Sequence, residues 1–169
     1  MCSKQLVESA MVVVLALMLV FGCGCVHCVT VPQNSNTDML ALLDFKQAIT
    51  SDLRGFFNSW NNSVDYCKWN GVTCSQTHPG RVRELNITGQ SLEGRISPSL
   101  GNLTLLKRLD LSSNSLFGQL PNINRLRRLK GLDLNNNKLQ GLELDAFKNC
   151  SSLLYLDLSA NKLEGSTPP

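Results

Sequence analysis

The chain is poor in aromatic residues, poor in charge and without a long apolar run. Aromatic residues make up 6% and charged residues 17% of 169 residues, and the formal net charge is +3. This mild charge balance excludes a polybasic nucleic-acid binder, so no nucleic-acid partner is expected. A hydrophobic content of 43% excludes both a chain disordered by composition and a membrane bundle. The length leaves room for one domain, which is too little for a kinase, a dehydrogenase or a hydrolase.

Residue sets for catalysis and metal binding are also missing. His78 is the only histidine beyond the first thirty residues, and no cysteine or serine lies at a recognisable spacing from it. Cys23, Cys25, His27 and Cys28 look like a metal cluster, but no second pair of ligands follows. A glycine-rich phosphate loop is absent too. We therefore expect no enzyme activity, no catalytic residue, no metal and no cofactor.

Residues 1–28 have the order of a secretory signal peptide. Lys4 lies in a short polar start, an apolar run extends from Ala10 to Phe21, and small residues follow at 22–25. The run is too short to cross a hydrocarbon core of about 30 Å at about 1.5 Å per residue. We expect cleavage between residues 24 and 30, and a secreted mature chain without a transmembrane segment. An N-terminal membrane anchor is the alternative.

Three cysteines remain beyond the leader region, and two of them are expected to pair. Cys67 and Cys74 bracket Asn70-Gly71, a strong turn signal, and a secreted chain enters an oxidising compartment. The spacing predicts a disulfide between them, with two free thiols as the alternative. Cys150 is left over; it is either a small buried residue, which its apolar neighbours favour, or it pairs outside the chain.

Leucine and asparagine are abundant and recur at fixed steps. The chain has 30 Leu and 16 Asn, and the template L-x-x-L-x-L-x-x-N-x-L occurs four times. The copies start at Val82, Leu106, Leu129 and Leu153. We expect repeats over 82–105, 106–128, 129–152 and 153–169, the last incomplete. The pattern predicts an α/β solenoid, a right-handed stack of leucine-rich-repeat coils that share one core.

Each part of the template has a physical role. Leu109 and Leu111 alternate with Asp110 along a short strand, so the leucines face the core and the aspartate faces out. The amide at the turn can bond backbone groups that the strand leaves unpaired. These turn positions are Gln90, Asn114, Asn137 and Asn161. A Leu-x-Gly follows each turn, at Gly94, Gly118, Gly141 and Gly165, where glycine permits a backbone conformation closed to other residues.

Residues 31–80 differ in character and are expected to cap the first coil. Thr37 or Asp38 can N-cap an apolar helix over residues 39–49. About half of the aromatic residues follow, at Phe56, Phe57, Trp60, Tyr66 and Trp69. A solenoid exposes apolar surface at its first coil, so the helix, the aromatic cluster and the disulfide together suit a cap.

These motifs resemble a known family. Thr37-Asp38, Ala41–Lys46, Ser59-Trp60-Asn61 and Cys67–Cys74 resemble the N-terminal cap of plant leucine-rich-repeat receptor kinases and receptor-like proteins, and Ile96–Thr104 is similar to the plant-specific repeat of that family. In the family such ectodomains are extracellular, bind peptides, carbohydrates or co-receptors, and precede a transmembrane helix and a kinase. The resemblance implies an extracellular protein-binding module, located at the plasma membrane if it belongs to a longer receptor.

The sequence reaches Pro169 within a repeat and shows no kinase motif, which leaves three interpretations. The first is the ligand-sensing start of a receptor ectodomain in defence or developmental signalling, without its own kinase. The second is a free small secreted protein that acts as a co-receptor partner, a decoy or an inhibitor of a cell-wall-degrading enzyme. The third is a nonfunctional gene fragment. The leucines of the last coil lack a cap, so we also expect association through that edge.

Candidate sites on the surface are glycosylation sequons and an exposed strand face. The sequons are at Asn61, Asn86, Asn102 and Asn149. Asn102 is the favoured acceptor. Asn86 lies on the predicted binding face, where a glycan would crowd a ligand, and the alternative is that Asn86 stays unmodified. Arg125, Arg127, Arg128 and Lys130 form the only charge cluster, expected on a solvated convex segment, with an anionic wall polysaccharide as the alternative partner.

The outward strand positions form the predicted concave face. They are Arg83, Glu84, Lys107, Arg108, Asp110, Ser112, Lys130, Asp133, Asn135, Tyr155, Asp157 and Ser159. A mixed polar strip of this kind suits recognition of a peptide, a protein or another leucine-rich-repeat ectodomain. A solvated face without a ligand is the alternative, because polar surface is the default.

Overall fold

The structure, a computed structural model, describes residues 34–142 and 145–164. The predicted signal peptide lies outside the described residues, as do the start of the predicted cap and residues 165–169 of the last repeat. Within the described part, none of the helices combines the length and the apolar character needed to cross a membrane.

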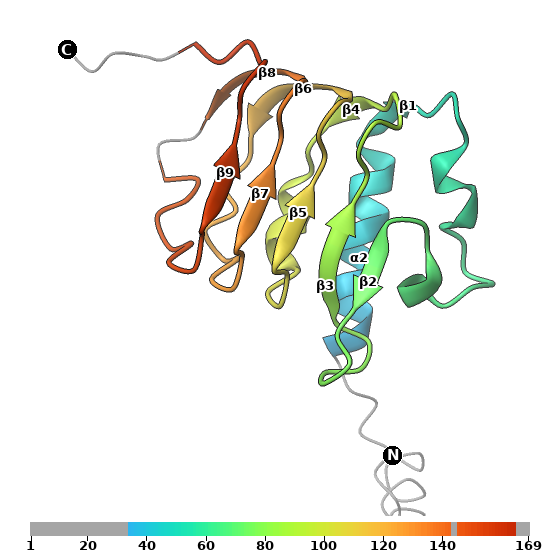
Figure 1. Cartoon of the computed structure of the whole chain (residues 1–169). Coiled ribbons are helices and arrows are strands. Elements are labelled where there is room, and N and C mark those ends of the chain that lie inside the picture. The colour runs from blue at the N-terminus through green and yellow to red at the C-terminus, as the bar shows by residue number, and fades with distance from the viewer. Residues whose placement is uncertain (1–33, 143–144, 165–169) are drawn as a thin grey trace, which may run out of the picture. The chain divides into compact units, whose positions relative to one another are not determined.

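Two sheets run along a solenoid (Figure 1). The larger sheet contains, in spatial order, β2 (Val72–Cys74), β3 (Val82–Asn86), β5 (Arg108–Asp110), β7 (Gly131–Asp133) and β9 (Tyr155–Asp157). The smaller sheet contains β1 (Ile49–Ser51), β4 (Glu93–Arg95), β6 (Ser115–Leu120) and β8 (Lys138–Leu142). Successive coils add parallel strands to each sheet. The predicted solenoid fold is confirmed.

The repeat spacing puts equivalent leucines side by side in the larger sheet. Leu85 pairs with Leu109, Leu109 with Leu132, and Leu132 with Leu156. The first three side chains are at most 1% exposed, so they form a continuous core between the two sheets. Truncating such a side chain to alanine removes about 2–5 kcal/mol of stability through lost burial and a residual cavity.

The turn after each strand of the larger sheet has left-handed backbone geometry. The φ angle is 67° at Gly89, 55° at Ser113, 54° at Asn136 and 51° at Ala160. Only the first of these positions has glycine, although a left-handed residue with a Cβ costs about 1 kcal/mol or more. Hydrogen bonds between the turns of successive coils offset that cost, such as Ser113 N–H to the Asn135 carbonyl at 3.0 Å.

The glycines that follow the turns do not all behave as expected. Gly94 has φ of 152°, and a Cβ there would lie 2.4 Å from the Ala48 carbonyl oxygen. Gly118 also has positive φ, at 84°. Gly141 does not, because the register between β6 and β8 shifts after Gly118 and places Gly141 opposite Gln119 in an ordinary strand conformation. The requirement for glycine therefore holds at Gly94 and Gly118 only, among the described copies.

The cap is held on a helix, α2 (Asn34–Gln47), whose Ala41, Leu42 and Phe45 are buried. The helix begins upstream of Thr37 and Asp38, so neither is its N-cap. Asp38 is instead fully buried, and its carboxylate accepts hydrogen bonds from the Val82 N–H at 2.8 Å and the Arg81 guanidinium at 3.1 Å. This carboxylate ties the cap helix to the first strand of the repeats.

Both sheets are closed at the cap end by antiparallel strands. The cap strand β1 pairs antiparallel with β4, and β2 pairs antiparallel with β3. The short 3-10 helix η3 (Pro98–Asn102) adds a further contact, because the Ser99 hydroxyl donates to the Asp44 carboxylate at 2.6 Å. The outer strands at this end, β1 and β2, have three residues each, and such short edge strands limit pairing with another chain.

Aromatic residues fill the space beside the helix. The 3-10 helices η1 (Phe56–Ser59) and η2 (Tyr66–Lys68) bring Trp60 and Trp69 into a stacked pair with ring centroids 5.1 Å apart. Both side chains are at most 2% exposed, and the Trp60 Nε1–H donates to the Asn70 carbonyl at 3.0 Å. Buried tryptophans stabilise strongly when the indole N–H has a partner, and here it has one.

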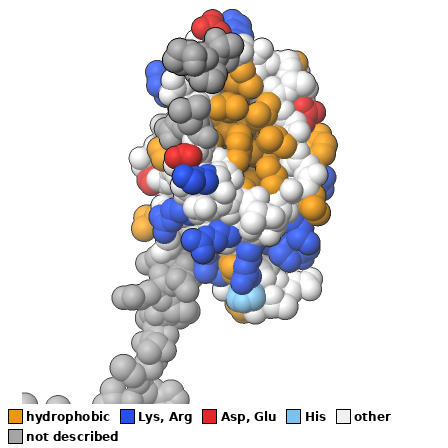
Figure 2. All heavy atoms as spheres, turned by 90° about the vertical axis from the view of Figure 1, so that its left-hand side faces the viewer, with side chains coloured by type: hydrophobic (Ala, Val, Ile, Leu, Met, Phe, Trp, Pro, Cys, Tyr) orange, Lys and Arg blue, Asp and Glu red, His pale blue; other side chains and the backbone are white. Residues whose placement is uncertain are grey.

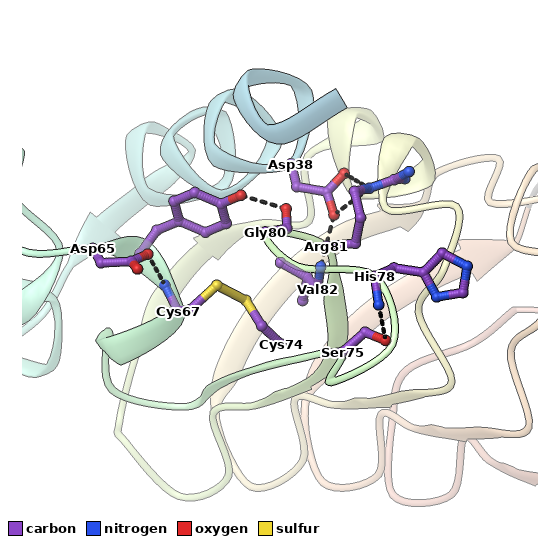
Figure 3. Close-up of a disulfide and its surroundings, with 10 residues drawn as sticks. Asp38, Asp65, Cys67, Cys74, Ser75, His78, Gly80, Arg81 and Val82 are labelled. Carbon is purple, nitrogen blue, oxygen red and sulfur yellow. Dashed lines mark hydrogen bonds and ion pairs between the residues drawn. A yellow bond between two sulfur atoms is a disulfide. The ribbon is translucent and has the colours of Figure 1, made fainter. Parts of the chain in front are cut away.

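The predicted disulfide between Cys67 and Cys74 is present (Figure 3), with the two Cα atoms 5.4 Å apart. It joins η2 to the end of β2, and the Asp65 carboxylate accepts the Cys67 N–H at 3.0 Å. The Tyr66 hydroxyl donates to the Gly80 carbonyl. Cys150 is a free thiol that is 7% exposed, and burial raises its pKa. The expectation that Cys150 is buried is met.

Apolar side chains are exposed at the end of the solenoid opposite the cap. Leu154 is 82% exposed, Leu156 43% and Leu142 39%. Figure 2, which views the molecule from the β8–β9 side, shows hydrophobic side chains gathered on this face and Lys and Arg side chains below them. Association through this edge stays a prediction.

Candidate binding face on the five-stranded sheet

Registered strands arrange the solvent side of the larger sheet in rows that run across the strands. Arg83 is the second residue of β3, whereas Lys107 and Lys130 directly precede β5 and β7. The three residues occupy equivalent positions in the register of the sheet, and we call them the basic row. The backbone places them in line, because Lys107 N–H bonds the Arg83 carbonyl at 2.7 Å and Lys130 N–H bonds the Lys107 carbonyl at 2.8 Å. The next row contains Glu84, Arg108, Gly131 and Tyr155, which pair in register.

Side chains of these two rows line an open hollow of about 330 Å³. Its lining residues are Arg83, Glu84, Lys107, Arg108, Lys130, Gly131 and Tyr155, and we call it the basic hollow. Gly131 lies between Arg108 and Tyr155 in the row and contributes no side chain to the hollow. A Cβ at Gly131 would meet the Arg108 side chain at 4.0 Å, an ordinary contact, so the fold does not require glycine there.

Positive charge in the basic hollow is only partly compensated. The Arg83 guanidinium lies 3.6 Å from the Glu84 carboxylate, and both side chains are well exposed. Lys107, Arg108 and Lys130 make no ion pair with any described residue. Exposed cations on parallel strands repel one another, and a bound anion relieves that repulsion. The hollow is therefore suited chemically to a negatively charged group.

A second line of charge lies further along the same strands. Asp110 and Asp133 pair in register, as do Asp133 and Asp157, and we call these three residues the acidic row. Each carboxylate accepts the backbone N–H two residues later, for example Asp157 from Ser159 at 2.9 Å. These bonds close the turn at the end of each strand. The acidic row thus has a structural role whether or not a ligand binds.

Tyr155 connects the basic hollow with the acidic row. Its hydroxyl lies 3.3 Å from carboxylate oxygens of both Asp133 and Asp157. Loss of water contact, followed by these two carboxylates, raises the pKa of the phenol. Hydrogen bonds from Ser159 lower the pKa of Asp157. Tyr155 is 51% exposed, so its ring forms a wall of the hollow that a ligand can touch.

Three predicted members of the face have hydroxyl or amide groups that are already bonded. The Ser112 hydroxyl donates to Asp110 at 2.7 Å, the Asn135 amide to Asp133 at 2.7 Å, and the Ser159 hydroxyl to Asp157 at 2.6 Å. Ser112 is also only 5% exposed, contrary to the expectation that it faces solvent. Ser112 lies in the turn after β5, where its hydroxyl bonds Asp110 and Thr88, so it is not part of the accessible face.

The turn residues predicted from the repeat bond backbone of the preceding coil. The Asn114 amide donates to the Ile87 carbonyl at 2.8 Å and its oxygen accepts the Leu92 N–H at 3.0 Å. Asn137 and Asn161 make equivalent bonds one and two coils further on. Gln90 differs, because its amide donates only to the Thr88 carbonyl, within its own turn. These amides are occupied by the fold and are unavailable to a ligand.

The sequons and the arginine cluster lie outside the basic hollow. Asn86, at the end of β3, is on the same sheet but does not line the hollow. Asn61, Asn86 and Asn149 are exposed, and the half-buried Asn102 accepts a hydrogen bond from Arg125 at 2.6 Å. A second hollow of about 460 Å³ is lined by Thr104, Leu105, Asn124, Arg125, Arg127, Arg128 and Asn149. Lys130, which the sequence groups with these arginines, lies in the basic hollow instead. The sequence interpretation therefore joined two separate surfaces.

Comparisons with known proteins place both parts of the chain. Residues 35–75 match the family described as "Leucine rich repeat N-terminal domain", and residues 105–125 and 127–168 match leucine-rich-repeat families. The "LRR receptor-like serine/threonine-protein kinase EFR" of Arabidopsis thaliana is 43% identical over 97 residues, which is 56% of this chain and 9% of that protein. The chain thus spans about a tenth of this relative's length.

Two solved structures share the fold at useful identity. The BIR3–SERK2 complex from Arabidopsis thaliana contains a chain that is 36% identical, with a TM-score of 0.67, over 75% of this chain and 70% of that one. The plant peptide hormone receptor RGFR1, solved in complex with RGF2, is 36% identical, with a TM-score of 0.51, over 59% of this chain and 19% of that one. Cap and repeats are therefore similar to plant ectodomains in sequence and in structure.

Proposed function

The chain belongs to the family of plant leucine-rich-repeat receptor ectodomains, and we propose that it acts outside the cell by binding a peptide on the solvent side of its larger sheet. The observation that carries the proposal is the basic hollow, which side chains from four registered strands line. Binding rather than catalysis is the proposed activity.

The position of the hollow on strands supports this proposal. Its lining residues lie on or directly before β3, β5, β7 and β9, whose backbones are fixed by ladder hydrogen bonds. A site that is already ordered costs less conformational entropy on binding than a mobile loop does. Charged and aromatic side chains that project from such a scaffold are typical of specific recognition surfaces.

Relatives support the class of ligand. RGFR1 is a peptide hormone receptor solved with RGF2, and BIR3 and SERK2 form a complex with each other. We extend both kinds of partner to this chain, a peptide on the larger sheet and another ectodomain as the second candidate. The exposed Leu154 and Leu156 favour the second candidate, because apolar side chains at a surface edge are typical of protein contacts.

Secretion and signalling belong to the same proposal. The Cys67–Cys74 disulfide suits an oxidising, extracellular location. Within a longer receptor, the module would contribute to ligand sensing in defence or development. As a free secreted protein, it would act as a co-receptor partner, a decoy or an inhibitor of a wall-degrading enzyme. Both settings use the same binding face.

A displayed library of random peptides tests the proposal. Peptides selected on the wild-type protein are re-tested on an Arg108→Ala/Tyr155→Ala variant and on a matched Gln119→Ala/Gln140→Ala variant of the smaller sheet. All four side chains are exposed, so each variant is expected to fold. We expect binding to be lost only in the first variant. Selected peptides that bind both variants equally, or no selected peptide at all, would refute the proposal.

A further inference from the structure

Three of the four cations of the basic hollow have no partner among the described residues, and this limits what can occupy the hollow. Lys107, Arg108 and Lys130 form no ion pair and no side-chain hydrogen bond with the described residues. Glu84 is the only carboxylate in the lining, and Arg83 already contacts it. A neutral or basic segment would leave this positive charge uncompensated or increase it.

We propose that the peptide segment held in the basic hollow is acidic and crosses the strands, with carboxylates at alternate positions facing the basic row. The inference rests on the proposed function, because it specifies the ligand of the same face. Its occupant is a peptide with aspartate or glutamate side chains.

The spacing of the strands supports the crossing direction. Neighbouring strands lie about 4.8 Å apart, so Arg83, Lys107 and Lys130 present three cations along a line of about 10 Å. An extended peptide places every second side chain on one face, about 7 Å apart. Two such carboxylates therefore fall within reach of the three long, flexible basic side chains.

The acidic row sets the boundary of the site. Asp110, Asp133 and Asp157 lie at the opposite end of the same strands, three residues beyond Lys107 in the case of Asp110. Like charge repels a carboxylate-rich ligand from that half of the sheet. The acidic segment is therefore confined to the starts of the strands, beside Tyr155, whose exposed ring covers one end of the hollow.

The second hollow has three arginines, and its surroundings differ from those of the basic hollow. Arg125 is already bonded to Asn102 at 2.6 Å, and Asn149 of a sequon lines the same space. A glycan on Asn149 would fill part of that hollow. The arginines nevertheless provide a matched control, because they carry the same charge at a different place on the surface.

Three synthetic peptides of equal length test the inference by calorimetry or fluorescence anisotropy. In them glycine alternates with glutamate, glutamine or lysine. We expect the glutamate peptide alone to bind, with an affinity that falls between about 50 and 200 mM salt as screening increases. A galacturonate oligomer is the fourth probe. If only the oligomer binds, or if the glutamine peptide binds as well as the glutamate peptide, the inference is overturned.

Charge-matched variants locate the binding. The double variant Lys107→Gln/Lys130→Gln is expected to bind the glutamate peptide with an affinity that is lower by about tenfold or more. Arg127→Gln/Arg128→Gln removes the same charge outside the basic hollow and is expected to change binding by less than about twofold. An equal loss of affinity in both variants would indicate a general effect of charge and would overturn the assignment of the ligand to the basic hollow. Unfolding curves of both variants check that the fold is intact.

The outcome can be separated from that of the proposed function. If the peptide library yields neutral or basic ligands that still require Arg108 and Tyr155, the peptide-binding function stands and the acidic ligand is wrong. If no ligand depends on Arg108 and Tyr155, the proposed function itself fails.

Discussion

The carboxylate of Asp38 accepts the backbone N–H of Val82 at 2.8 Å, across 44 residues of sequence. Figure 3 shows this carboxylate, on the cap helix, facing both Val82 and Arg81. Arg81 in turn donates to the Thr104 hydroxyl at 2.8 Å, so one buried charge connects the cap with the start and the end of the first repeat. The cap and the repeats are therefore expected to unfold together.

Replacing Asp38 with alanine should destabilise the whole domain. The change leaves the Arg81 guanidinium, whose side chain is 14% exposed, without its partner and leaves the Val82 N–H unpaired. We expect a loss of about 3–5 kcal/mol in the free energy of unfolding, measured by urea denaturation. Asp44→Ala is the control: Asp44 is exposed, and the loss should be about 1 kcal/mol or less. Similar losses in both variants would contradict this role of Asp38.

Asn137 should matter far more to stability than Gln90, its counterpart in the first turn. Asn137→Ala removes three bonds to carbonyls and the acceptor of the Leu116 N–H at a site that is 8% exposed. The expected loss is about 3 kcal/mol, because several buried groups lose their partners. Gln90→Ala removes one exposed bond, with an expected loss within about 1 kcal/mol. Equal thermal midpoints for the two variants would refute this ranking.

Filling the basic hollow should block binding without harming the fold. In Gly131→Thr, a Cβ meets only the Arg108 side chain at 4.0 Å, and a β-branched residue suits a strand. We expect stability to be unchanged or higher by up to about 1 kcal/mol, with the affinity for the acidic peptide reduced about tenfold. Gln119→Thr on the smaller sheet is the control. Undiminished binding by a folded Gly131→Thr variant would show that the ligand does not enter the hollow.

Both tyrosines of the chain should lose their phenol protons at a higher pH than free tyrosine does. Burial, followed by the charges of Asp38 and Asp65, raises the pKa of Tyr66 above its ordinary value of 10.0. The pKa of Tyr155 is raised by loss of contact with water and, in addition, by two nearby carboxylates. Because the folded state holds these protons more tightly, their contribution to stability is complete below pH 10 and is lost as the pH rises through the folded-state pKa.

The absorbance of the phenolate gives a direct measurement of this shift. We expect the native protein to titrate at higher pH than the denatured chain. Tyr66→Phe and Tyr155→Phe assign the two steps, since the chain has no other tyrosine. A native titration at the denatured-state pH would contradict the environments described for these two phenols.

The sequence was sufficient for those features that repeat or lie close together along the chain. Leu109 and Leu132 are identified as core by their period, and the Cys67–Cys74 pair by its short separation. Asp38 looked like a helix cap because its neighbours in sequence allowed it, whereas its partners lie on β3. The interpretation from sequence had no means to weigh a contact across 44 residues.

Six of the seven residues that line the basic hollow are among the outward strand positions predicted from the repeat, and Gly131 is the exception. Lys130 is adjacent in sequence to Arg127 and Arg128, yet its side chain lies with Lys107 from the preceding coil. Gly131 carried no signal in the sequence, because its importance comes from the side chains on either side of it in the sheet. The pairing of β5 with β7 places Gly131 directly beside Arg108, and this register identifies the hollow.

The hydrogen bonds of the turn asparagines determine the order in which the coils unfold under a pulling force. Each of the three turn asparagines bonds backbone of the coil before it, as Asn161 does with Leu134 and Leu139, so peeling away one coil exposes the turn of its predecessor. The cap end is locked by antiparallel strands and a disulfide. A pulling force applied to the two ends should therefore unravel the coils in sequence from β9 towards β3, as a row of small force steps, and leave the cap until last.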